Sequence, residues 1–454
     1  MKHSQSSKSP KIDFTKGSLW KQLILFFIPL LAGSLFQQLY ITVDAIMVGQ
    51  FIGKDGLASI ESVHSLIRLP VNFFVGLSTG ATIIISQCFG SRDNQQLSKT
   101  VHTAVAFSFI GGLMLSIAGV ILAPYCIRLM EVPEEISQMT LSYLRIYFSG
   151  LAFSMLYNIG AGILRAVGDS KTPFYYLIAS SIINITLDFL FVGIFHWGVS
   201  GAALSTVIAQ IVSAALIIIG LIKTKLECKL ILKKIKFHSS IFKSIIFVGL
   251  PIGLQSSLFP IANMTIQANI NGMGTDNIAA WALCGKLDFL VWLIADSFAA
   301  TISTVVAQNY GALNFARLRK GVRLGMLITS ALITILSIIL YFFCEPLGHL
   351  FIRSEDFNVI PIAGEFMRFL APLYLLYVFG EILSGAIRGT GETVKPMILS
   401  LFGTCICRIL WISLVVPHNP TMMTILASYP VSWALASLFF IIYYYFLPPN
   451  PLRK

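Results

Sequence analysis

Charged residues are scarce in this sequence: they make up 11% of its 454 residues, whereas a soluble domain usually carries about 25%. Hydrophobic residues account for 56% of the chain. A water-soluble fold has no interior large enough for this much apolar surface, so the composition excludes soluble enzymes and disordered chains. At about 20 residues for each crossing of a bilayer, the length leaves room for roughly a dozen helices. The sequence therefore predicts an all-α polytopic membrane protein.

Motifs of enzymatic catalysis and metal binding are also missing. The seven cysteines form no CxxC or Cys/His pattern, and their odd number gives no disulfide framework. The sequence has no Walker lysine, HExxH motif or nucleophile elbow. We therefore expect a protein that is not an enzyme, that needs no cofactor, and that could use ATP only through a partner chain.

Apolar stretches between charged or Pro/Gly-containing breaks predict twelve membrane spans. Their approximate limits are residues 20–48, 57–85, 101–125, 138–164, 173–196, 200–222, 241–270, 278–306, 322–344, 358–386, 395–416 and 421–447.

The basic residues fall mainly on one side of this arrangement. Alternate loops and both chain ends hold 24 of the 32 Lys and Arg when Lys21 and Lys243 at the span edges are counted with them. Cytoplasmic loops are the basic ones, so we expect a multi-pass protein of the cell (inner) membrane with both termini in the cytoplasm. Six lysines between residues 223 and 236 could bind anionic lipid or nucleic acid. The positive-inside rule favours an orienting loop, and we expect no nucleic-acid partner.

The two halves of the chain resemble each other at a nearly constant offset. Residues 162–173 recur as 385–396, and residues 87–90 recur as 308–311. Because each half holds an even number of spans, both halves insert in the same direction, which predicts two six-helix lobes related by a parallel pseudo-two-fold repeat.

This repeat gives the expected domain organisation. It comprises a cytoplasmic N-terminal tail (1–19), an N-lobe of spans 1–6 (20–222), a basic cytoplasmic linker (223–240), a C-lobe of spans 7–12 (241–447) and a cytoplasmic C-terminal tail (448–454).

Ionisable side chains inside the spans are candidate functional residues, because a charge in the membrane interior is costly. Asp44 lies 23 residues beyond Lys21, which is about 35 Å along a helix and places it in the outer half of the membrane. Asn184 and Asp188 are four residues apart and share one face of the fifth span. With the hydroxyl of Thr206 nearby, they would offer oxygen ligands to a small cation, or the two acids could exchange protons. Alternatively, Asp44 only caps its helix and Asp188 only pairs with an amide.

These residues and motifs resemble those of the multidrug and toxic-compound extrusion (MATE) transporters of the short prokaryotic type. The resemblance covers residues 20–446 and rests on Pro29, Gln37 and Asp44, on the doubled Gly-x-x-Arg-x-x-Gly-[Asp/Glu]-x-x-x-Pro motif, and on the paired Gln-x-[Phe/Tyr]-Gly motif. It implies a secondary active antiporter that exports amphiphilic organic cations or drugs in exchange for Na⁺ or H⁺.

The same resemblance implies an N-lobe cation site. Its residues match Asp44, Asn184, Asp188 and Thr206, with Gln37 and Tyr40 nearby. Pro29 is either a hinge or a static kink in the first span. We expect a monomer that meets small organic molecules and the lipid bilayer.

The second lobe lacks this set of residues but has buried charges of its own. By the repeat offset, Asp44 corresponds to Ile266 and Asp188 to Trp411. Pairing of Lys286 or Arg408 with an acid of this lobe would be a structural role; alternatively, the acids face a cavity for a cationic drug. The acids are Asp288, Asp296 and Glu381, and the candidate cavity residues are Gln255, Asn263, Gln267, Asp288 and Glu381.

A lipid-linked saccharide flippase of the same superfamily is the main alternative function. Such a protein would favour a strongly cationic central cavity and more than twelve spans. A membrane enzyme that acts on lipid ranks last, since no reactive group of residues is present.

Overall fold

The computed structural model describes residues 12–351 and 358–446, and the described part is almost entirely helical. The predicted C-terminal tail and residues 1–11 of the predicted N-terminal tail lie outside the described residues. The first half of the chain forms helices α1 (Leu19–Phe51), α2 (Lys54–Gly90), α3 (Asn94–Leu129), α4 (Glu134–Ser149), α5 (Leu151–Ala166), α6 (Lys171–Asp188), the π-helix η1 (Phe189–Ile194) and α7 (Gly198–Lys223).

The short 3₁₀ helix η2 (Leu232–Lys234) leads into the second half. This half forms α8 (Ser239–Asn271), α9 (Thr275–Leu287), α10 (Phe289–Gly311), α11 (Phe315–Gly348), α12 (Val359–Leu370), η4 (Ala371–Leu373), α13 (Tyr374–Gly389), α14 (Val394–Ser400), the π-helix η5 (Leu401–Ile406), α15 (Cys407–Leu414), η6 (Val416–His418), α16 (Met422–Leu426) and α17 (Ser428–Phe446).

The twelve predicted spans are confirmed as helical segments. Eleven helices in the described residues are long and apolar enough to cross a membrane, and the count is twelve if α4 and α5, bent by 43° at Gly150, form one span. Large apolar side chains remain exposed along them, such as Met114 (67%) and Ile121 (62%) on α3. Such surfaces are stable against lipid tails rather than water.

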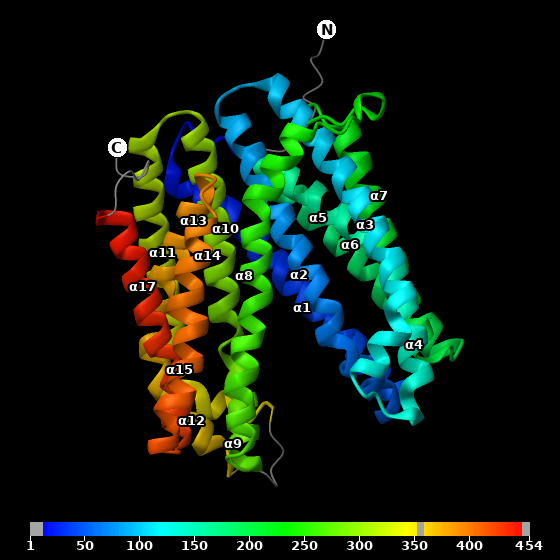
Figure 1. Cartoon of the computed structure of the whole chain (residues 1–454), viewed down its shortest axis with the longest axis vertical. Helices are drawn as coiled ribbons and strands as arrows, with labels where there is room; N and C mark the ends of the chain where they lie inside the picture. Colours follow the sequence, from blue (N-terminus) through cyan, green and yellow to red (C-terminus); the bar gives the residue numbers. More distant parts are fainter. Residues whose placement is uncertain (1–11, 352–357, 447–454) are drawn as a thin grey trace. The chain divides into compact units, whose positions relative to one another are not determined.

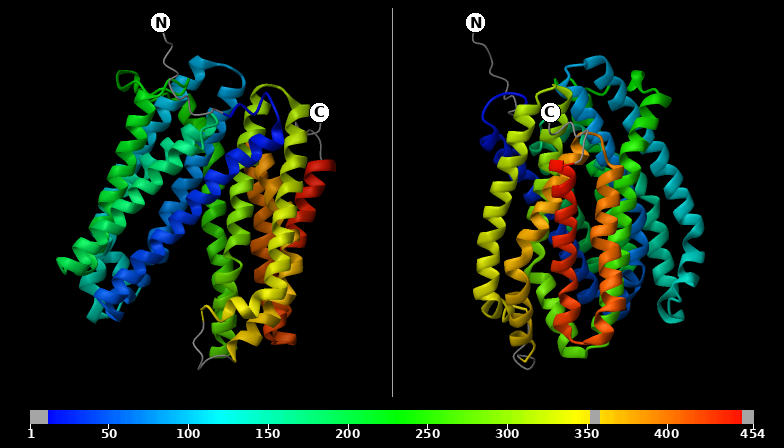
Figure 2. Two further views of the ribbon diagram at one scale, coloured as in Figure 1. Left: turned by 180° about the vertical axis from the view of Figure 1, so that it is seen from behind. Right: turned by 60° about the vertical axis from the view of Figure 1, so that its left-hand side comes forward.

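The chain divides into two compact units. Of the described residues, the first unit contains 12–17 and 24–253, and the second contains 18–23, 254–351 and 358–446. Within each unit the long helices run side by side (Figures 1 and 2). Helices α1 and α8 each contribute to both units, because the division falls inside them.

The core of the first unit is formed by apolar side chains of four helices and the start of α8. Ala81 and Ile85 of α2 are fully buried, as are Leu97 of α3, Ile163 of α5 and Ile217 of α7. This packing fixes α7, which carries Thr206, and the half-buried Tyr176 of α6 packs against the same core.

Candidate functional site

Three helices of the first unit supply the predicted cation-site residues. Helix α1 carries Gln37, Tyr40 and Asp44, whose spacing of three and four residues places them on one face. Helix α6 carries Asn184 and Asp188, and both side chains are buried. Helix α7 carries Thr206, which is half-buried. The structure therefore brings all six residues to one unit, with Asp44 against α6.

The carboxyl groups of Asp44 and Asp188 interact directly. Asp188 also accepts a hydrogen bond from the hydroxyl of Ser205. Oδ1 of Asp44 and Oδ2 of Asp188 are buried and have no hydrogen-bond partner among the described residues. Two carboxyl groups in contact away from water cannot both remain charged without compensation, so this pair would hold either a shared proton or a bound cation.

Asn184 adds an amide to this group. The side chain is 2% exposed, and neither its oxygen nor its nitrogen has a hydrogen-bond partner in the described part of the chain. Buried amides are almost always hydrogen-bonded, so this one indicates a missing ligand. The hydroxyl of Thr206 donates to the carbonyl of Ala202 at 3.0 Å, which leaves its oxygen lone pairs available.

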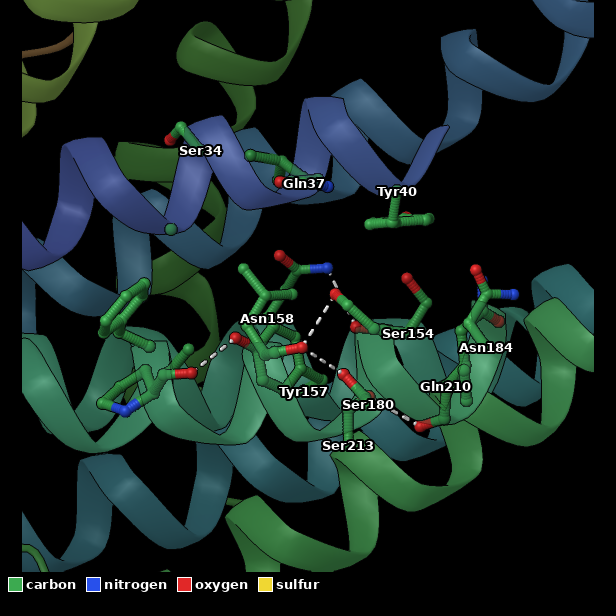
Figure 3. A pocket seen from close by; sticks show the side chains of 18 of the residues that line it. Ser34, Gln37, Tyr40, Ser154, Tyr157, Asn158, Ser180, Asn184, Gln210 and Ser213 are labelled. Carbon is green, nitrogen blue, oxygen red and sulfur yellow. Dashed lines mark hydrogen bonds between the residues drawn. The ribbon is translucent and has the colours of Figure 1, made fainter. Parts of the chain in front are cut away.

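A cavity of about 390 Å³ adjoins the site within the first unit. Its lining includes Pro29, Gln37, Tyr40, Asn184 and Thr206. Figure 3 shows Tyr40 pointing from α1 toward the space that Ser154 and Asn184 border on the opposite wall. An ion or proton at the two acids is thus next to a polar cavity of the same unit.

The oxygen-rich composition of the site suits a small, hard cation. Two carboxylates, an amide oxygen and a hydroxyl are ligands of the kind that Na⁺ accepts. The described residues contain no group of three or more His, Cys, Asp or Glu that could hold a metal ion.

Sequence reasoning missed Ser205 and the π-helix that follows Asp188. Ser205 directly precedes the predicted Thr206 on α7. Which of these two hydroxyl groups faces Asp188 depends on the rotation of α7 about its axis, and the sequence does not give that rotation. The π-helix η1 begins at Phe189, directly after Asp188. Short π segments often occur at functional sites, because the extra residue in the turn redirects side chains.

The prediction that Lys286 or Arg408 pairs with an acid of the second unit is wrong for the described residues. Glu381 pairs with Arg388 at 2.7 Å rather than with Lys286 or Arg408. Asp288 accepts a hydrogen bond from the hydroxyl of Tyr374 at 3.0 Å. The repeated motif itself supplies the basic partner, seven residues after Glu381, and a pairing within one helical segment is geometrically easier than one between spans.

The predicted cavity residues of the second unit do not line one common cavity: four of them border two different cavities, and Gln255 is buried and forms a hydrogen bond. Asn263 and Glu381 border one cavity, and Asn263, Gln267 and Asp288 border a second. Gln255 is 6% exposed and donates to the hydroxyl of Ser400 at 2.9 Å. Asp296 accepts a hydrogen bond from Tyr377 at 3.3 Å.

Comparisons with known proteins agree with this architecture. The family model described as MatE matches the chain twice, over residues 29–190 and 251–414. The "Probable multidrug resistance protein YoeA" of Bacillus subtilis (strain 168) is 28% identical, over 98% of this chain and 97% of its own length. The "Probable multidrug resistance protein YpnP" of the same organism is 26% identical, over 87% and 88%. A structure described as "Crystal structure of MATE in the bent conformation" superposes with a TM-score of 0.88 at 22% identity, covering 95% of each chain.

Proposed function

Because the chain belongs to the MatE family, we propose that it is a secondary active antiporter that exports amphiphilic organic cations in exchange for Na⁺ or H⁺. Relatives over nearly the full length are named multidrug resistance proteins, which supports efflux of small organic compounds. The observation that carries the coupling proposal is the contact between Asp44 and Asp188, with orphaned polar atoms on both acids and on Asn184.

Coupling requires that the ion bind one conformation more tightly than the other. The acids come from α1 and α6, so any movement of α1 relative to α6 changes the distance between the two carboxyl groups and hence the affinity for the ion. Pro29 lies inside α1 and lines the same cavity. A proline frees the carbonyl four residues before it from the helix ladder, which makes this position a suitable hinge.

Both termini are proposed to lie in the cytoplasm of a cell whose plasma membrane holds the protein. This orientation places the acids in the outer half of the membrane. The ion would then enter from outside and be released inward while the organic cation leaves.

Transport by reconstituted protein tests the proposal. Proteoliposomes loaded with ethidium would be given either a Na⁺ gradient or a pH gradient, and dye movement would be followed by fluorescence. We expect one gradient to drive transport. Asp44→Asn and Asp188→Asn should each reduce the rate by roughly tenfold or more, because each removes a charge that the ion contacts.

Asp55→Asn provides the matched control, since Asp55 is an exposed acid at the start of α2 in the same unit. It should transport at the wild-type rate. Gradient-driven transport that survives both Asp44→Asn and Asp188→Asn would refute the coupling site but not the exporter. Absence of dye movement under both gradients would refute the exporter and favour lipid-linked substrates.

A further inference from the structure

Arg408 is a buried cation of the second unit that the proposed antiport does not use. It lies on α15 and is 5% exposed. Its Nε donates to the hydroxyl of Ser432 at 3.0 Å, and its Nη1 donates to Oδ1 of Asn263 at 2.7 Å. The guanidinium carbon lies 4.5 Å from the centre of the Tyr429 ring. These contacts hold the side chain in one position.

All of these neighbours are neutral. No Asp or Glu of the described residues forms an ion pair with Arg408. The three acids of this unit that the sequence singled out have other partners: Glu381 bonds to Arg388, Asp288 to Tyr374, and Asp296 to Tyr377. A guanidinium stays charged under all physiological conditions, and burying it in a membrane span without an anion is expensive. Among the described residues, the charge of Arg408 is therefore met by a ring and by neutral hydrogen-bond acceptors, and not by an acid.

The guanidinium also borders a cavity. This space measures about 330 Å³, and its lining includes Asn263, Trp292, Arg408, Tyr429 and Trp433. Glu381 also borders it, and the carboxylate of Glu381 is paired with Arg388 at 2.7 Å. A second cavity of about 330 Å³ shares Asn263, Trp292 and Tyr429 with it and is also lined by Asp288, which accepts a hydrogen bond from Tyr374. Such volumes and aromatic walls are typical of sites for drug-sized ligands.

Two residues that line this cavity have N–H groups without an acceptor in the described part of the chain. A guanidinium has five N–H groups, of which the structure pairs one at Nε and one at Nη1. Trp433 is 3% exposed, and its indole N–H has no hydrogen-bond partner among the described residues. Donors without acceptors beside a fixed positive charge are the complement of an oxyanion.

We propose that the second-unit cavity binds the oxyanion of an aromatic amphiphile, with Arg408 as the anchor and Trp292, Tyr429 and Trp433 as the apolar walls. The ligand is a carboxylate or phosphate attached to an aromatic body. This site differs in place and in charge preference from the cation-coupling site of the first unit, and binding to it requires no ion gradient.

Equilibrium binding of a matched probe pair tests this proposal. The probes are 7-diethylaminocoumarin-3-carboxylate and its neutral ethyl ester, which share one fluorophore and differ in the anionic group. Full-length protein in phosphatidylcholine nanodiscs should bind the carboxylate more tightly than the ester by roughly tenfold, as a charge-assisted contact supports. Empty nanodiscs give the partition background of each probe.

Two substitutions remove the anchor in different ways. Arg408→Gln deletes the positive charge. Asn263→Asp places a carboxylate at the atom that already accepts from Nη1 at 2.7 Å, so the guanidinium gains a permanent partner with little change in shape. Both variants should bind the two probes equally, with the ester affinity unchanged.

Asn271→Asp is the matched control for the added charge. Asn271 lies on α8 like Asn263, is exposed, and accepts a hydrogen bond from Gln267 rather than from Arg408. It should retain the preference for the carboxylate. If Arg408→Gln fails to fold, as shown by size-exclusion and thermal unfolding, Asn263→Asp alone decides the question.

A second set of nanodiscs containing phosphatidylglycerol identifies the source of the oxyanion. Competition by this lipid, lost in Asn263→Asp, would support the same site with a lipid headgroup as occupant. Unchanged probe affinity would support a soluble amphiphile. Equal binding of carboxylate and ester to the wild type, or a wild-type preference in Asn263→Asp, would overturn the proposal.

Discussion

The residues with a left-handed backbone follow the internal repeat. Three pairs of positive-φ positions are separated by 221 or 223 residues: Gly53 with Gly274, Arg92 with Leu313, and Gly168 with Gly391. Asp93 and Asn314, which follow Arg92 and Leu313, both cap a helix by accepting from the backbone N–H three residues later. The repeat seen in the sequence thus reflects the same turns at the same places in each half.

Gly168 also permits a close approach of the N-terminal segment. Its φ is 88°, and the backbone N–H of Ile12 donates to its carbonyl at 3.2 Å. A Cβ at this position would lie 1.8 Å from the carbonyl oxygen of Ile12. Only glycine satisfies both the backbone conformation and the contact.

Asp13 forms an ion pair with Arg92 in the turn after α2 and so connects the N-terminal segment to that turn. The stability that this ion pair contributes should depend on pH. Partial burial raises the pKa of Asp13, but hydrogen bonds from Thr15 and Arg92 outweigh it and hold the pKa below its usual value. Stability from this carboxylate is therefore present above the unfolded-state pKa of about 3.9 and is lost as the pH falls through the lower folded-state value.

We expect Asp13→Asn to lower the unfolding temperature at pH 7, and the difference from wild type to shrink as the pH approaches 3. Thermal unfolding of both proteins across this range measures it. A difference that stays constant or grows on acidification would contradict the assignment.

At the scale of elements, several predicted spans are interrupted helices. The fourth span breaks at Gly150, and the tenth contains the 3₁₀ turn Ala371–Leu373 with Pro372. The fifth and eleventh spans each contain a π-helix, η1 and η5. Hydropathy identifies the apolar length of a span but not the hydrogen-bond pattern inside it, so these breaks were beyond prediction.

The first half of α8 approaches α2 at glycines. A Cβ added to Gly76 would lie 2.4 Å from the Cα of Gly253, and one added to Gly80 would lie 2.5 Å from the Cα of Gly249. Small residues let helices in membranes approach until their backbones touch.

Gly76→Ala should therefore force the two helices apart and lower stability by about 1–3 kcal/mol, as overpacking usually does. Gly49→Ala is the control, since nothing lies within 4 Å of its added Cβ; there the methyl should be neutral or stabilising by about 0.5–1 kcal/mol. Thermal unfolding midpoints in detergent compare the two. Equal midpoints for both variants would contradict a backbone-limited contact.

At the scale of the whole molecule, the proposed orientation gives a direct prediction. A fluorescent protein fused after residue 454 should fluoresce, because such fusions fold only in the cytoplasm, whereas alkaline phosphatase at the same place should be inactive. Phosphatase fused after Met130, beyond the third span, should be active. The reverse pattern would show the opposite orientation.

The sequence by itself determined the class, the spans and the repeat. The class follows from composition, the spans follow from the length of the apolar stretches, and the repeat follows from motifs that recur in the same order. None of these requires knowledge of how the helices pack. Candidate acids could also be named, since a carboxylate in an apolar span stands out against its surroundings.

Only the tertiary structure decided which of these side chains meet. It placed Asp44 against Asp188, paired Glu381 with Arg388, and surrounded Arg408 with neutral side chains. Such pairings depend on the rotation and depth of each helix relative to the next, which side-chain packing sets and the linear order of residues does not record.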